Sequence, residues 1–241
     1  MNTLHGYGCS FMYGLQKKPK NYVGSLGPYQ NKSVGNFLAE ELNASCFRNH
    51  AQSGSSNIDI AHQVKSTKFT KGDFAFILWS GLHRVPLDKC ERQRPTSAEG
   101  QEKFYNRAAA RSIKAVIKTH EYLVKNKVNF AMATAFQDYK FYQYVNIPDH
   151  VKTYWIDCHI KNNSMIDIIT DKVGSTQWEN FQAVVANDIG LNLPDSAFRQ
   201  NDIRKHDTIA KCFHPTELGH KKAAKYYAER IKEKFWQKVT T

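Results

Sequence analysis

The sequence predicts an α/β fold, in which helices cover both faces of a parallel β-sheet and residues 1–241 form one domain. Three observations support this prediction. Short apolar segments alternate with segments of helical periodicity along the chain. The segment 73–79 is almost continuously apolar, as expected of a strand buried on both faces. Finally, 241 residues, of which 41% are hydrophobic, are enough to bury a sizeable core.

The first half of the chain is expected to hold three strands and two helices. Residues 3–9 form the first strand, and residues 12–32, rich in Gly, Tyr, Lys and Pro, form a long loop. Ser33 is a suitable cap for the first helix, because apolar residues recur on one face after it. The elements that follow are a helix at 34–42, a strand at 44–48, a small-residue turn at 49–57, a helix at 58–68 and the strand at 73–79.

The second half is expected to hold two strands and two long helices. Ser97 caps a helix that runs to about Asn126, with an apolar stripe at helical spacing. Pro215 suits the first turn of a final helix that reaches about Trp236. The strands lie at 128–133 and 151–156, and residues 160–212 carry only a weak pattern, with a short helix at 176–188. The order β-α-β-α-β-α-β-β-α predicts a doubly wound sheet.

Composition narrows the class of protein. No apolar run reaches the 18 or so residues of a membrane span, and Met1 leaves no room for a signal peptide before the first strand. The five cysteines are odd in number and scattered, which favours free thiols in a reducing compartment over a disulfide framework. The sequence therefore predicts a cytoplasmic protein without a membrane partner.

The net charge of +12 has two interpretations. It can be a solvated basic surface, or it can serve nucleic acid or another polyanion. No nucleic-acid-binding motif accompanies the charge. A nucleotide-binding function is disfavoured as well, because the turns contain neither G-x-G-x-x-G nor a P-loop.

Small-residue turns follow the first three predicted strands, around Ser10, Gly54 and Ser80. Because the carboxyl ends of parallel strands share one edge of the sheet, these turns should converge there. Ser10 is a candidate nucleophile, although a serine in a Gly-rich turn is often only a turn residue. His214, ahead of the final helix, is the candidate base. The backbone N–H groups of Ser10 and Gly54 can serve as an oxyanion hole.

These stretches resemble blocks one, two and five of the SGNH/GDSL hydrolase superfamily, in the family's order and at both ends of the chain. The matching segments are Gly8-Cys9-Ser10-Phe11, Asn49-x-Ala51-x-x-Gly54-x-Ser56-Asn57 and His214-Pro215 with Gly219-His220. The resemblance implies a three-layer, flavodoxin-like α/β/α fold and a serine esterase that uses neither metal nor cofactor. The implied substrate is a small ester or an O-acyl group on a carbohydrate. Small stand-alone members also occur in bacteriophage genomes, so the chain can be virus-encoded.

Three positions depart from the family pattern. Cys9 stands where the first block usually has Asp. The third block, beginning at Trp79-Ser80, lacks the usual Asn, for which Ser80 or Arg84 can substitute. Arg84 can equally bind an anionic substrate group, and Asn57 is either a substrate-side residue or a helix cap. Lys211 replaces the acid of the fifth block, which leaves Asp207 as the nearest upstream carboxylate to orient His214.

Other constellations leave alternatives open. Cys212, His214 and His220 match no common zinc spacing, so no metal is expected, and His220 is expected to be packed or solvated in the last helix. The aromatic residues Phe136, Tyr139, Phe141, Tyr142 and Tyr144 are either core or a stacking surface. The alternative to an active esterase is a catalytically silent module of the same fold that binds a glycan or polyanion.

Overall fold

The computed structural model describes residues 1–16, 29–30, 32–81, 84, 97–135, 147–156, 164–169, 208 and 215–236. Its centre is a sheet of four strands in which every neighbouring pair is parallel. The strands are β1 (Thr3–Gly8), β4 (Cys46–Asn49), β5 (Phe74–Trp79) and β6 (Asn129–Thr134), in the order β4-β1-β5-β6. Counted along the chain this order is second, first, third, fourth, which is that of a flavodoxin-like sheet.

The predicted strand at 151–156 is wrong in most of its length. Residues Asp149–Lys152 form the short helix α6. Only the end of the expected strand reaches the sheet: Trp155 forms a parallel bridge to Met132, whose N–H donates to the Tyr154 carbonyl and whose carbonyl accepts the Ile156 N–H. Pro148, with φ −57°, starts the helical turn, and the Thr153 hydroxyl donates to the His150 carbonyl at 2.6 Å. The Val151 and Lys152 N–H groups, which a strand would have directed sideways, donate instead to the Pro148 carbonyl at 2.9 and 3.2 Å.

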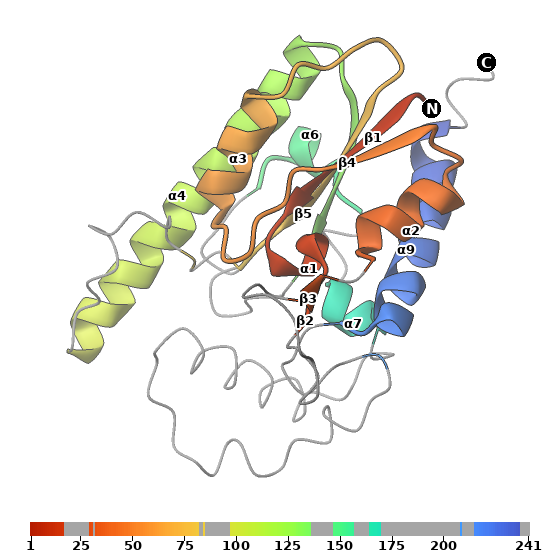
Figure 1. Cartoon of the computed structure of the whole chain (residues 1–241). Coiled ribbons are helices and arrows are strands. Elements are labelled where there is room, and N and C mark those ends of the chain that lie inside the picture. The colour runs from red at the N-terminus through yellow and green to blue at the C-terminus, as the bar shows by residue number, and fades with distance from the viewer. Residues whose placement is uncertain are drawn as a thin grey trace.

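Helices cover both faces of the sheet (Figure 1). One face packs against α1 (Ser10–Tyr13), α2 (Val34–Glu41), α7 (Met165–Ile169) and α9 (Glu217–Ile231). The other face packs against α3 (Asn57–Lys65) and α4 (Ala98–Lys125). Alternate residues of β5 serve the two layers: Phe74, Phe76 and Leu78 enter the first core, and Ala75, Ile77 and Trp79 enter the second. The predicted three-layer α/β/α architecture is confirmed.

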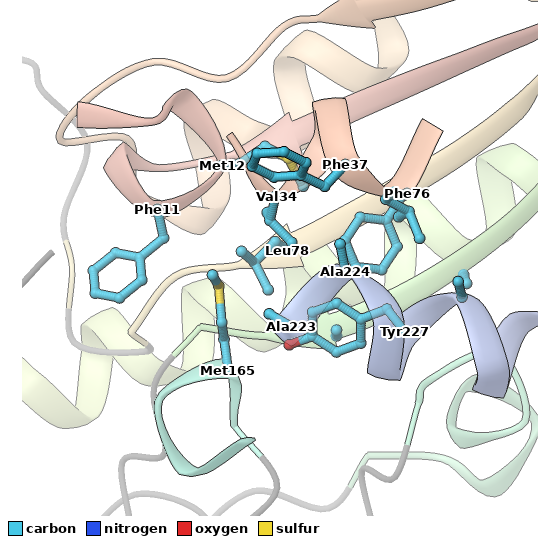
Figure 2. Packing of buried hydrophobic residues seen from close by; sticks show 14 of the residues in the cluster. Phe11, Met12, Val34, Phe37, Phe76, Leu78, Met165, Ala223, Ala224 and Tyr227 are labelled. Atoms are coloured by element: carbon cyan, nitrogen blue, oxygen red, sulfur yellow. The ribbon is translucent and has the colours of Figure 1, made fainter. Parts of the chain in front are cut away.

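Helix α9 runs antiparallel to β5. Its Tyr227 ring lies 5.1 Å from the ring of Phe76, and Phe235, one π-helical turn beyond α9 (Lys232–Trp236), lies 6.5 Å from Phe74. Figure 2 shows Ala223 and Tyr227 beside Leu78 and Phe76 in this core. The first turn of α9 therefore lies at the carboxyl edge of the sheet, where its strands end.

The predicted helix caps are confirmed at two positions and displaced at a third. Ser33 begins α2 in a capping box with Asn36, and Ser97 accepts the Gly100 N–H at 3.2 Å at the start of α4. Helix α3 is capped by Ser56, one residue before the Asn57 considered from the sequence, because the Ser56 hydroxyl accepts the Asp59 N–H.

The expected loop at 12–32 begins with α1 and contains the two-residue strands β2 (Leu15–Gln16) and β3 (Tyr29–Gln30), which pair antiparallel. The remainder of that loop, the predicted helix at 176–188 and the aromatic residues 136–144 lie outside the described residues. Within the described part of the chain, no helix has both the length and the apolar stretch that crossing a bilayer requires.

Candidate functional site

The site begins with one rung that joins β1, β5 and the segment after β4. The Cα atom of Gly8 pairs with that of Leu78 on β5, and the Gly8 carbonyl accepts the Gln52 N–H at 3.2 Å on the β4 side. Two residues beyond this rung the chain reaches Ser10, Gly54 and Ser80, one on each of three adjacent turns. The three turns therefore leave the carboxyl edge of the sheet side by side.

Ser10 is the first residue of α1, and its side chain is nearly buried, with 4% of the residue exposed. The backbone N–H at the first position of a helix is not used by the helix itself. The turn brings Gly8 so close to Met12 that a Cβ on Gly8 would lie 2.7 Å from the Met12 Cβ. Only glycine therefore fits at this position. Gly14, with φ 82°, ends the helix by donating its N–H to the Ser10 carbonyl at 3.1 Å.

Gly54 adopts φ 82°, a left-handed conformation that glycine takes without strain. The next residue, Ser55, is fully buried, and its hydroxyl has no hydrogen-bond partner within the described residues. The Ser80 hydroxyl is also buried and also has no hydrogen-bond partner within the described residues. Buried hydroxyls are normally paired, so both serines are unusual among the described residues. The sequence pattern gave no signal that distinguished Ser55 from other turn residues.

Asn57 has a different role from the substrate contact that the sequence suggested. Its side chain is fully buried, and its amide oxygen accepts the Ser80 N–H at 2.8 Å. Its amide nitrogen donates to the Ser80 carbonyl at 3.1 Å. This two-point contact ties the turn after β5 to the start of α3, so Asn57 holds Ser80 in place.

The other residues proposed from the sequence are placed less directly. Arg84 is half-buried and follows Ser80 by four residues, with its N–H donating to the Gly81 carbonyl at 3.2 Å. Asp207 and His214 lie outside the described residues. Their described neighbours are in contact, because the Thr216 N–H donates to the Thr208 carbonyl at 2.9 Å.

Thr208 packs closely against the start of α9. A Cβ on Gly219 would lie only 2.3 Å from the Thr208 carbonyl oxygen, so glycine is required where these segments meet. Thr216 caps α9 by accepting the Gly219 N–H at 3.2 Å. His220, in the first turn of this helix, is fully buried, which is the packed one of the two positions expected for it. Thr208 is thus held against the start of α9, at the carboxyl edge of the sheet.

A second polar cluster lies on the α3 face of the sheet and was not predicted from the sequence. His5 Nε2 lies 3.3 Å from Asp73 Oδ2, and His5 Nδ1 lies 3.0 Å from His50 Nε2. Burial lowers the pKa of His5, and burial with the neighbouring His5 and Arg48 lowers the pKa of His50 to about 4. Burial raises the pKa of Asp73, but hydrogen bonds from Thr70 and His5 outweigh it and lower that pKa.

These charges and tautomers fit one chain of hydrogen bonds. With Asp73 ionised, His5 donates Nε2–H to the carboxylate and accepts at Nδ1, so His50 donates its Nε2–H. Asp73 precedes β5 at the amino edge of the sheet, whereas His50 follows β4 and its ring stacks on that of Tyr7 at 4.8 Å. The cluster therefore links the start of β5 to the middle of β1 and the end of β4. The only feature of the sequence that pointed to this cluster was the alternation of polar and apolar residues in β1.

The fold and the site together define a class of protein. In a sheet of this order the topological switch point lies between the first and third strands, β1 and β5, and ligands of such sheets bind there. Ser10 and Ser80 follow these two strands. The chain is therefore a flavodoxin-like α/β/α protein in which Ser10 and Ser80 follow the two strands that flank the switch point.

No protein-family model matches the chain, and no curated protein sequence does. Among solved structures, it resembles an acetyl xylan esterase (Est2A) from the rumen bacterium Butyrivibrio proteoclasticus, with a TM-score of 0.51 and 12% identity. That match covers 98% of this chain and 64% of the esterase, so the chain spans less than two thirds of that protein. A match to a second carbohydrate esterase has a TM-score of 0.36 and 12% identity, over 59% of this chain and 49% of the other. The first likeness supports the fold.

Proposed function

We propose that the protein is a serine esterase of SGNH type that removes an acyl group, most plausibly acetyl, from a carbohydrate. The observation that carries the proposal is the side-by-side position of Ser10, Gly54 and Ser80 at the switch point of the sheet. The resemblance of an acetyl xylan esterase in overall fold supports the choice of substrate. The proposed site needs neither a metal ion nor a cofactor.

In the proposed reaction the Ser10 oxygen attacks the ester carbonyl carbon while His214 takes the serine proton. The N–H groups of Ser10 and Gly54 and the Ser80 hydroxyl donate to the oxyanion. His214 then returns the proton to the leaving alcohol, and the carbonyl re-forms as an acyl-enzyme. A water molecule, deprotonated by His214, attacks the acyl carbon and releases the acid and Ser10.

Asp207 is proposed to orient His214 in place of the acid that Lys211 replaces in the family pattern. The contact between Thr208 and Thr216 supports this assignment, since each threonine is within two residues of one of the pair. Arg84 is proposed to bind an anionic group of the substrate. The buried hydroxyl of Ser55 is a further donor on the Gly54 turn.

Labelling with a fluorophosphonate probe tests the proposal, since the probe reacts with an activated serine. We expect wild-type protein to be labelled, Ser10→Ala to be unlabelled and His214→Ala to be labelled far more slowly. Ser66→Ala is the matched control, because Ser66 is exposed at the end of α3. Folded wild-type protein that resists the probe, or Ser10→Ala protein that reacts with it, would contradict the assignment.

The second candidate function is a catalytically silent module that binds a glycan or polyanion. The absence of the usual Asn from the third block, Lys211 in place of the usual acid and the +12 charge favour it. It predicts no labelling and no hydrolysis of acetylated xylan or p-nitrophenyl acetate. It also predicts salt-sensitive binding that is unchanged by Ser10→Ala.

A further inference from the structure

The solvent-facing side of α4 carries a row of five cations with no acidic residue between them. At about 100° per residue, the five positions fall within about 80° of the helix circumference. Ala108, Ser112 and Val116, which are buried, lie on the opposite side of the same helix. We call this row the α4 stripe; its members, all exposed, are Lys103, Arg107, Arg111, Lys114 and Lys118.

The stripe is regular in spacing as well as in sign. With a rise of about 1.5 Å per residue, neighbouring cations are about 4.5–6 Å apart along the axis, and the row is about 22 Å long. Glu99 pairs with Lys103 at one end, at 2.6 Å, and the exposed Glu121 follows the other end. Like charges three and four residues apart destabilise a helix. Solubility does not require them, because a surface of interspersed positive and negative charges is equally soluble. The arrangement therefore calls for a binding role.

The stripe extends past the candidate site. Helices α3 and α4 run side by side in the same direction (Figure 1), and the Tyr122 hydroxyl donates to the Lys65 carbonyl at 3.3 Å. Lys114 precedes Tyr122 by eight residues, and Asn57 precedes Lys65 by eight residues. Lys114 is therefore level with the start of α3. Figure 1 shows that α4 projects beyond the start of α3. Arg111, Arg107 and Lys103 precede Lys114 in the sequence of α4, so they belong to this projecting part. That part is level with the carboxyl edge of the sheet and the space beyond it.

We propose that the α4 stripe binds an acidic polysaccharide and holds it along the side of the molecule, so that its acyl esters reach the serine turns. This inference rests on the proposed function and names its substrate class as an anionic, acylated glycan. A uronic-acid polymer carries at most one carboxylate per sugar, and the guanidinium groups of Arg107 and Arg111 suit carboxylates. The spacing of the cations along the stripe thus suits a polymer whose anions are also spaced apart.

Nucleic acid fits the stripe less well. Duplex DNA carries one charge per about 1.7 Å of helix axis, far denser than the cations of the stripe. Single strands are held by aromatic side chains that stack on bases. Between Lys103 and Lys118 the arc of the stripe carries only Lys and Arg side chains.

The test measures binding separately from hydrolysis. Polygalacturonate, neutral xylan and a 20-nucleotide single strand are titrated into the Ser10→Ala protein at 50 mM and 500 mM salt. The variant Arg107→Glu/Lys114→Glu reverses two charges of the stripe, and Lys68→Glu/Lys71→Glu makes the same charge change at exposed positions of the turn before β5. Circular dichroism verifies that both variants are folded, as helix-compatible surface substitutions should be.

We expect polygalacturonate to bind at 50 mM salt and to be released at 500 mM, because screening weakens exposed charge contacts. The stripe variant should bind at least tenfold more weakly and the control variant less than twofold more weakly, while xylan does not bind. In the Ser10-containing protein, the stripe variant should hydrolyse p-nitrophenyl acetate at the wild-type rate. If the wild-type protein does not hydrolyse p-nitrophenyl acetate, the proposed function is contradicted. The binding measurement still tests the α4 stripe, because it does not depend on hydrolysis.

Three outcomes would overturn the proposal. In the first, polygalacturonate does not bind at low salt. In the second, both charge-reversal variants weaken binding equally, which shows a diffuse charge effect. In the third, the oligonucleotide binds through the stripe and polygalacturonate does not, which identifies nucleic acid as the partner.

Discussion

Replacing Asn57 with alanine tests whether the turn after β5 is part of the chemistry. The substitution removes the two hydrogen bonds by which the Asn57 side chain holds the backbone of Ser80, at 2.8 and 3.1 Å. Both partners are buried, so the Ser80 N–H and carbonyl would lose their side-chain partner in a region that is closed to solvent.

The expected loss of stability follows from these two bonds. Leaving a buried polar group unsatisfied costs about 1–3 kcal/mol, so the two groups together should cost about 2–5 kcal/mol. For a chain of this size, 1 kcal/mol shifts the melting temperature by about 2–4 °C, which gives a decrease of about 4–20 °C. A displaced Ser80 should also slow fluorophosphonate labelling by about ten- to hundredfold, since small misplacements of catalytic groups have effects of that size.

The matched control is Asp73→Ala, at the opposite end of the same strand. Asp73 is buried and accepts hydrogen bonds from the Thr70 N–H at 2.8 Å and the Thr70 hydroxyl at 2.9 Å. Its loss should destabilise the protein by a similar amount. The labelling rate of the folded protein should not change, because Asp73 lies at the amino end of β5, away from the serine turns.

Thermal unfolding gives the melting temperature, and labelling kinetics measured well below that temperature separate the effect on the site from the effect on stability. Asn57→Ala protein that is labelled at the wild-type rate would refute the role of Ser80 in the site. Asn57→Ala protein with an unchanged melting temperature would refute the energetic reasoning.

Two further predictions concern the His5, His50 and Asp73 cluster and the start of α9. Because the pKa of His50 is lowered to about 4, the unfolded chain binds protons more readily than the native state between about pH 6.5 and pH 4, so stability should fall as the pH is lowered through this range. The lowered pKa values of His5 and Asp73 act in the same direction, and His50→Gln should flatten a plot of melting temperature against pH; a profile identical to wild type would contradict this assignment. Gly219→Ala should reduce stability by about 1–3 kcal/mol, because its Cβ would lie 2.3 Å from the backbone oxygen of Thr208. Denaturant unfolding measures this loss, and an unchanged midpoint would show that the two segments separate without penalty.

The sequence was sufficient to predict the fold class and most elements of the sheet. The apolar run at 73–79 corresponds to β5, and Ser33 and Ser97 begin the helices that they were expected to cap. These signals are local: a strand buried on both faces is apolar throughout, and a cap satisfies N–H groups within three residues. The strand expected at 151–156 was wrong because Pro148 and Thr153 favour a helical turn, a preference that apolar patterning does not reveal.

For the candidate site, the sequence by itself determined the residue types and their order: Ser10 after the first strand, Gly54 after the second and Ser80 after the third. Tertiary structure decided that each lies two residues beyond one rung, since register depends on the pairing of strands far apart in the chain. It also decided that Asn57 holds Ser80 and that His5, His50 and Asp73 are hydrogen-bonded to one another. Local patterns report the neighbours of a residue along the chain, whereas these contacts join positions 23 to 68 residues apart, which only folding brings together.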